Sequence, residues 1–326
     1  MTKKPWSDFT DLKSKSFVHA AQHVSPDDLY DMEHYRKAER MKTCGGVDPI
    51  HVVVVYAQDE MTYADGEKVN RFGLAYKRDA KLWLHKTLAD ITIDAVITLY
   101  QTQGWTTTLY DGLRTVDGAY KLYLAASDEA MSSGLLSLPG RSSHNKAMAI
   151  DSMMSDSSGQ EVDVGGHFDH PNMEMNSRAY AGDKISEAAK KNRLIRESAF
   201  MRAALLRGYL LAPLRSEFWH DQTPENREDL WRVLDSTARC MGIRLLTEED
   251  EKLRKENRAA FCAKWETWNY QDFLGKWKEI FRGREAELKK ILGVELPPAQ
   301  EKSEFYHGNY HPIYDEQLKA SGKNIT

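Results

Sequence analysis

Residues 142–151 of this chain read SSHNKAMAID. Within this stretch, His144 and Asp151 carry side chains of the types that bind metal ions in proteins. The run from residue 147 to residue 154 is apolar apart from Asp151 and Ser152. Because a carboxylate in such a run is costly to bury unless it is paired or binds a metal, we interpret His144 and Asp151 as metal ligands.

A second stretch, residues 216–220, reads SEFWH and supplies what is missing from a hydrolytic metal site. Zinc hydrolases keep three protein ligands and leave the fourth tetrahedral position to a water, whose pKa falls to about 7. His220 is the candidate third ligand, and Glu217 is close enough to that water to take its proton and pass it to a leaving amine. The sequence therefore predicts one Zn²⁺ per chain and a catalytic Glu217. Each motif alone occurs often by chance, but their conjunction, with Ser142 ahead of His144, is much more specific.

These motifs resemble those of the D-alanyl-D-alanine dipeptidases, a family of zinc peptidases that includes the vancomycin-resistance dipeptidase and is related to the D,D-carboxypeptidases and the Hedgehog fold. The family's first motif, Ser-x-His-x-x-Gly-x-Ala-x-Asp, is matched except that Ala147 stands at the usual Gly. Its second motif, Glu-x-Trp-His, is matched by residues 217–220. The resemblance covers roughly residues 50–222 and implies zinc-dependent hydrolysis of D-Ala-D-Ala or a similar short D-amino-acid peptide.

Two further segments extend the resemblance. Residues 111–114, DGLR, are similar to the family's Asp-Gly-Tyr-Arg segment, whose Arg steadies the oxyanion, with leucine here in place of the aromatic residue. Residues 165–169, GGHFD, are similar to its Met-Gly-x-x-Phe-Asp segment, whose Asp helps to hold the free amino group of the dipeptide. The resemblance therefore implies a catalytic role for Arg114 and substrate binding by Asp169 and Ser142.

Four other histidines could be taken for metal ligands. His167 and His170 flank Asp169, but three ligand positions are already filled, so we predict that these histidines at most support a ligand or face the substrate. His307 and His311 lie near the end of the chain. They could form a second metal site or close over the active site, and the simpler interpretation is a packing segment at the surface.

The composition narrows the class of protein. The formal net charge of −4 gives no basic face of the kind that nucleic-acid-binding proteins carry. No apolar run reaches the roughly 20 residues needed to span a bilayer, and the opening MTKKPW lacks the apolar core of a secretory signal. Cys44, Cys240 and Cys262 are too few and too scattered for a disulfide framework. We therefore expect a cytoplasmic protein with reduced cysteines and no nucleic-acid or membrane partner.

The expected secondary structure is mixed. Residues 50–57 include four consecutive valines and predict a strand buried on both faces. Residues 79–103 predict a helix that Asp79 caps and Gly104 ends, and residues 105–110 predict a Thr-rich strand. With the resemblance, these elements imply an α+β fold. It would have a small, mainly antiparallel sheet with flanking helices, as in Hedgehog and the D,D-peptidases, plus a helical C-terminal extension.

Helices are also expected on either side of this central region. Ser25-Pro26 predicts the start of a short helix that Cys44-Gly45-Gly46 ends. Residues 184–209 predict a helix that packs on the sheet, and Pro213, in the apolar approach to the second motif, is expected at a strand edge or bulge.

Residues 223–326 differ in character from the rest, because they carry helix signals and family dipeptidases end soon after the second motif. The helices expected in this part are residues 223–242, 247–262 and 271–292. The extension is a helical cap or a homo-oligomer interface, or alternatively a substrate-binding domain. The predicted parts are an N-terminal arm and helix at 1–49, a zinc peptidase domain at 50–222 and a helical extension at 223–326.

Three functions remain open from the sequence. The first is a D,D-dipeptidase that salvages or removes D-Ala-D-Ala, and the second is a D,D- or L,D-carboxypeptidase that acts on peptidoglycan stem peptides. The third is a non-catalytic zinc-bearing binding protein. Glu217 argues against the third, because a structural site is normally closed by four protein ligands and has no use for a neighbouring base.

Overall fold

A computed structural model describes the chain from residue 26 onward, with gaps. The chain divides into two compact units. The described residues are 26–63, 65–126, 136, 142–169, 185–207, 211–213, 217–223, 246–264 and 279. The first unit contains the described residues from 26 to 162 and 166–169, and the second contains Asp163–Gly165 and the described residues from 185 onward. The predictions outside the described residues are those for the N-terminal arm, the helices at 223–242 and 271–292, Cys240, His170, His307 and His311.

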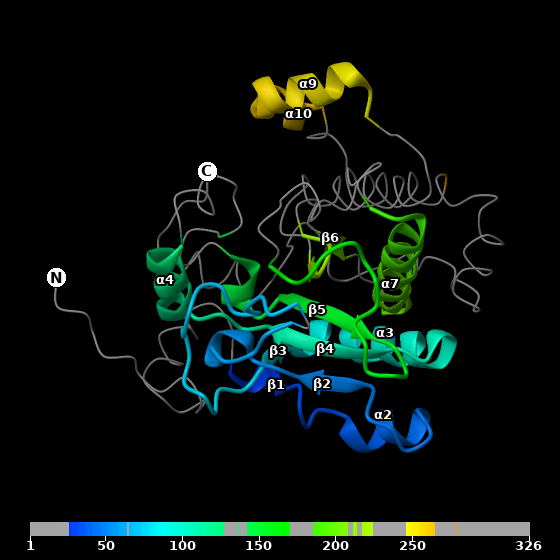
Figure 1. The fold of residues 1–326 in the computed structure, drawn as a ribbon. Coiled ribbons are helices and arrows are strands. Elements are labelled where there is room, and N and C mark those ends of the chain that lie inside the picture. The colour runs from blue at the N-terminus through cyan, green and yellow to red at the C-terminus, as the bar shows by residue number, and fades with distance from the viewer. Residues whose placement is uncertain are drawn as a thin grey trace, which may run out of the picture. The chain divides into compact units, whose positions relative to one another are not determined.

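The first unit is built on a mixed sheet with helices beside it (Figure 1). Its central strand, β4 (Thr106–Asp111), pairs in parallel with β2 (Ile50–Val52) and antiparallel with β5 (Ala149–Ser155). The helix α4 (Val116–Ala125) follows β4 in the chain. The predicted α+β class and the strand at 105–110 are therefore confirmed, and the sheet contains one parallel pair.

The predicted strand at residues 50–57 is only half right. β2 ends at Val52, and the chain then forms the 3₁₀ turn η2 (Val55–Ala57). His51 on β2 is exposed, so this strand is not buried on both faces. A run of β-branched residues favours extended backbone but does not encode where pairing stops. Here the chain turns to place Tyr56, whose carbonyl accepts hydrogen bonds from the backbone of Ala75 and Tyr76.

The long helix of this unit, α3 (Lys86–Gln103), begins later than predicted. Its N-cap is His85, whose ring accepts a hydrogen bond from the Thr87 N–H, and not Asp79. Residues ahead of it form β3 (Trp83–His85), which pairs antiparallel with β1 (Leu29–Asp31). The predicted end is confirmed, because Gly104 caps the helix at φ 72° in the left-handed region that favours glycine.

The predicted helix that starts at Pro26 is also corrected. Pro26–Asp28 forms only a 3₁₀ turn, η1, before β1, and the helix α2 (Lys37–Thr43) follows. The predicted stop at Cys44-Gly45 is confirmed, since Cys44 is the C-cap and Gly45 has a φ of 68°.

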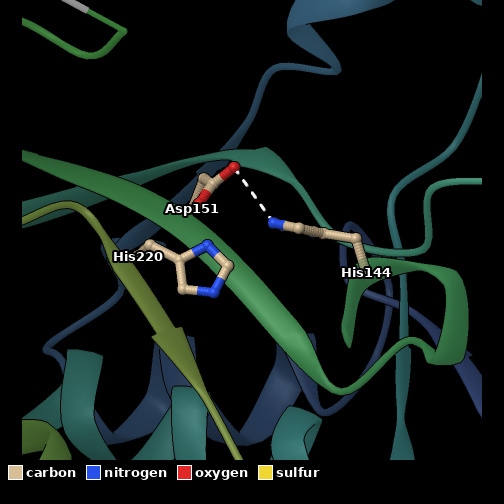
Figure 2. A group of neighbouring side chains, drawn as sticks. All are labelled: His144, Asp151 and His220. Atoms are coloured by element: carbon tan, nitrogen blue, oxygen red, sulfur yellow. Dashed lines mark ion pairs between the residues drawn. The ribbon is translucent and has the colours of Figure 1, made fainter. Parts of the chain in front are cut away.

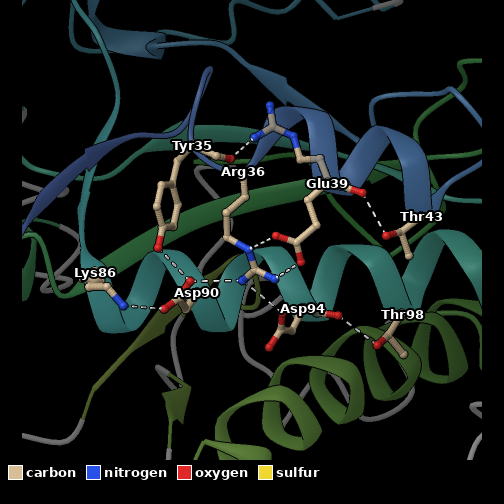
Figure 3. Close-up of polar contacts among 9 residues, drawn as sticks. Tyr35, Arg36, Glu39, Thr43, Lys86, Asp90, Asp94 and Thr98 are labelled. Carbon is tan, nitrogen blue, oxygen red and sulfur yellow. Dashed lines mark hydrogen bonds and ion pairs between the residues drawn. The ribbon is translucent and has the colours of Figure 1, made fainter.

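Polar contacts fasten this N-terminal segment to α3 (Figure 3). Arg36 pairs with Asp90 at 3.0 Å and with Asp94 at 3.3 Å, and Tyr35 donates to Asp90 at 2.9 Å. Charges on two separate segments therefore meet at one face of α3, which holds residues 35–43 against the helix that supports the sheet.

The described part of the second unit is mainly helical. The helix α7 (Glu187–Leu206) confirms the prediction for residues 184–209. The short strand β6 (Ala212–Pro213) pairs antiparallel with β7 (His220–Gln222), and β6 is last in the strand order, so Pro213 lies at a sheet edge as predicted. Among the helices of the described part of the chain, none has the length and apolar character that crossing a membrane requires.

The C-terminal extension contains a predicted helix that is interrupted. A Thr247 capping box opens α9 (Glu248–Glu256), as predicted, but the helix ends at Asn257. The Asn257 side chain accepts a hydrogen bond from the Ala260 N–H and so starts a second helix, α10 (Arg258–Ala263). Asn is a good N-cap and a poor residue for a helix interior, which accounts for the break.

Candidate metal centre

His144 lies in a short 3₁₀ turn whose start is fixed by a capping box. The turn η3 (Ser143–Lys146) has Ser142 as its N-cap. The Ser142 hydroxyl accepts from the His144 N–H at 3.2 Å, and the Asn145 side-chain oxygen accepts from the Ser142 N–H at 3.2 Å. The described contacts of Ser142 thus serve the backbone around His144, and its predicted substrate contact stays a prediction.

A backbone carbonyl sets the orientation of the His144 ring. Nδ1 lies 2.8 Å from the Gly112 carbonyl oxygen, which can only accept, so Nδ1 donates and Nε2 keeps the lone pair. Nε2 lies 3.3 Å from an Asp151 oxygen. Gly112 itself has no room for a side chain, because an added Cβ would lie 2.7 Å from the Trp83 carbonyl oxygen.

His144, Asp151 and His220 form the group that could hold a metal ion (Figure 2). Each offers one ligand atom, these atoms all lie within 4.8 Å of one another, and all three residues are buried. Asp151 is on β5, opposite Asp111 of β4, where the strand register shifts. Two imidazole nitrogens and one carboxylate oxygen are donors that Zn²⁺ binds at about 2.0–2.2 Å, so the residues fit this ion.

Glu217 is held beside His220 by a tight turn. The His220 N–H donates to the Glu217 carbonyl at 3.3 Å, and the Glu217 carboxylate lies 3.6 Å from Nδ1 of His220. Glu217 is 8% exposed. A buried carboxylate therefore lies beside one residue of the group of three without belonging to that group.

Arg114 is buried and held by Asp111. Its Nε donates to an Asp111 oxygen at 2.8 Å, and one terminal nitrogen lies 2.7 Å from the same carboxylate and 3.9 Å from Asp151. Its backbone N–H donates to the His144 carbonyl at 2.9 Å. These contacts fix a cation 3.9 Å from the Asp151 carboxylate of the metal group.

The Asp169 carboxylate accepts a hydrogen bond from Tyr56, a residue that the sequence motifs do not include. The buried Tyr56 hydroxyl donates to Asp169 at 2.8 Å, and the Arg114 guanidinium lies 5.3 Å from the Tyr56 ring centre. Burial, together with the charge of Asp169, raises the pKa of Tyr56 well above its usual range, so it stays a neutral donor. Only the position of Tyr56, directly after the valine run, could have drawn attention to it.

His167 is engaged away from the metal group. Its Nδ1 lies 2.9 Å from Glu161 and its Nε2 lies 3.4 Å from Asp65, while its ring stacks on Tyr63 at 3.9 Å. Each ring nitrogen therefore faces a carboxylate, and among the described residues His167 does not belong to the group that could hold a metal ion.

Ala147, which stands where the related motif has glycine, adopts a backbone conformation that is strained for alanine. Ala147 is fully buried and has a φ of 57°, in the left-handed region where glycine is favoured. The related motif therefore carries glycine here for a backbone reason.

We expect Ala147→Gly to change the free energy of unfolding by no more than about 1 kcal/mol, because relief of backbone strain offsets the added freedom of the unfolded chain. Ala147→Val should lower it by about 1–3 kcal/mol or more through overpacking and strain. Urea unfolding of the metal-free protein measures both. Equal stability of the valine variant and the parent would contradict this interpretation.

Comparison with known proteins gives two matches. Residues 42–239 match the peptidase M15 family, described as D-ala-D-ala dipeptidase. A D-alanyl-D-alanine dipeptidase from Escherichia coli (strain K12) is 28% identical over 167 residues, which is 51% of this chain and 78% of that protein. The family match includes all three residues of the metal group and Glu217, and it ends before α9.

Proposed function

The chain belongs to the peptidase M15 family of D-ala-D-ala dipeptidases, and from this membership we propose that it is a zinc-dependent hydrolase of D-Ala-D-Ala or similar short D-amino-acid peptides. The observation that carries the proposal is the buried group of His144, Asp151 and His220. Glu217 beside His220 supplies the proton acceptor that a purely structural metal site would not need.

In the proposed reaction each residue has one task. Zinc held by the group of three would acidify a water and polarise the scissile carbonyl. Glu217 accepts the proton of the attacking water and returns it to the departing amine. Arg114, which Asp111 holds in one orientation, shares the negative charge that develops on the carbonyl oxygen.

Substrate binding is assigned to charged and polar groups near these residues. We place the free ammonium of the peptide at Asp169, whose carboxylate is oriented by the Tyr56 hydroxyl at 2.8 Å. Ser142 is the second proposed substrate contact. A free dipeptide carries charges at both ends, so discrimination against longer peptides requires charge partners at both ends of the site.

The test is release of free D-alanine from D-Ala-D-Ala and from a matched stem pentapeptide, with zinc and again after chelation. We expect chelator-sensitive cleavage of the dipeptide alone. Cleavage of the pentapeptide instead would move the protein to the carboxypeptidases. Cleavage of neither, with zinc bound, would favour the zinc-bearing binding protein. L-Ala-L-Ala serves as the stereochemical control.

Other features of the sequence interpretation stay predictions. These are the division of the chain into residues 1–49, 50–222 and 223–326, cytoplasmic residence, and a homo-oligomer formed through the C-terminal helices. Sedimentation of the full chain at several concentrations tests the last of them.

A further inference from the structure

The strand that carries His220 also carries a polar partner for its ring. His220 and Gln222 are separated by one residue on β7, so their side chains fall on the same face of the strand. Nε2 of His220 lies 3.0 Å from the side-chain oxygen of Gln222, and both residues are buried.

This contact decides where the ring carries its proton. An amide oxygen can only accept, so Nε2–H is the donor, and in the neutral ring Nδ1 then holds the lone pair. Nδ1 is also the nitrogen that faces Glu217, at 3.6 Å. His144 shows the opposite arrangement, since its Nδ1 donates to a backbone carbonyl and its Nε2 keeps the lone pair.

We propose that Gln222 is a positioning residue that fixes His220 as an Nδ1 ligand of the metal ion. This inference rests on the proposed zinc site. Without an acceptor at Nε2, the proton can move to Nδ1, and that tautomer cannot bind a metal through the nitrogen beside Glu217.

The opposite face of β7 anchors the strand. Asp221 points away from His220 and pairs with Arg196 of α7 at 2.7 Å, with both side chains 2% exposed or less. The same Arg196 nitrogen donates to the Trp219 carbonyl at 2.8 Å. Arg196 therefore holds the chain at Trp219 and at Asp221, the two neighbours of His220, whereas Gln222 contacts the ring itself.

The experiment compares Gln222→Leu, which removes the acceptor, with Gln222→Glu, which keeps one. Zinc affinity is measured by competition with a chromogenic chelator. We expect Gln222→Leu to weaken zinc binding by about 10- to 100-fold, as loss of such outer partners does elsewhere, and Gln222→Glu to stay near the parent. Gln160→Leu makes the same change at an exposed position and should leave zinc affinity unaltered.

A second readout separates positioning from mere structural support. Nitrogen chemical shifts of the His220 ring in the metal-free protein should report Nε2–H in the parent and in Gln222→Glu, and a tautomer mixture in Gln222→Leu. Parent-like zinc affinity in Gln222→Leu would overturn the inference while leaving the proposed function intact. Equal loss of zinc and of thermal stability in both variants would also overturn it. Failure of the parent to bind zinc would remove the proposed function itself.

Discussion

Substituting Glu217 with alanine is expected to lower the rate of D-Ala-D-Ala hydrolysis by about 10²- to 10⁴-fold while zinc stays bound. Glu217 is a buried carboxylate 3.6 Å from His220 Nδ1, yet it is not one of the three residues of the metal group. In the proposed mechanism, the substitution would remove proton transfer to and from the reacting groups without removing a metal ligand.

The measurement pairs steady-state hydrolysis with zinc analysis of the same sample. Glu187→Ala, at a position whose side chain is 89% exposed on α7, is the matched control and should keep the parental rate. If Glu217→Ala lost zinc as well as activity, Glu217 would be a ligand. If it kept both, the proton acceptor would have to be another residue.

Substituting His144 with alanine should remove zinc and reduce hydrolysis to background. The backbone of His144 donates to Ser142 and accepts from Arg114, and an alanine preserves both contacts. The fold should therefore survive while one of three ligands is lost. We expect zinc affinity to fall by more than the about 10- to 100-fold that loss of an outer partner costs.

His167→Ala is the control for this experiment. His167 is engaged by Glu161 and Asp65, so its loss should leave zinc content unchanged. Zinc analysis after gel filtration distinguishes the two variants. Retention of zinc by His144→Ala, or its loss from His167→Ala, would show that the ligands have been misassigned.

The site residues could be predicted from the sequence where side-chain chemistry alone restricts which residues bind a metal ion. Buried carboxylates and histidines at motif spacing predicted the three residues that the structure brings together. What the sequence could not supply was their partners. Tyr56 and Asp169 are 113 positions apart, and only the fold brings the hydroxyl to the carboxylate.

Two predicted boundaries of helices and strands are wrong for a related reason. The N-cap of α3 is His85 and not the predicted Asp79, because residues 83–85 pair with β1. Local helix signals carry no information about such a long-range contact. The valine run after residue 50 predicts one strand, although strand pairing ends at Val52 and a turn follows. In the first case a long-range strand pairing overrides the local preference, and in the second the strand ends where its pairing ends.

Gly112 contributes to the site through its backbone and through its lack of a side chain. Its carbonyl holds the His144 ring at 2.8 Å, and an added Cβ would lie 2.7 Å from the Trp83 backbone and within 2.9 Å of two leucine side chains. Random mutagenesis should therefore find position 112 as intolerant of replacement as the ligands, although this residue contributes no reactive side chain. A variant inactivated there would still contain every group that takes part in the chemistry.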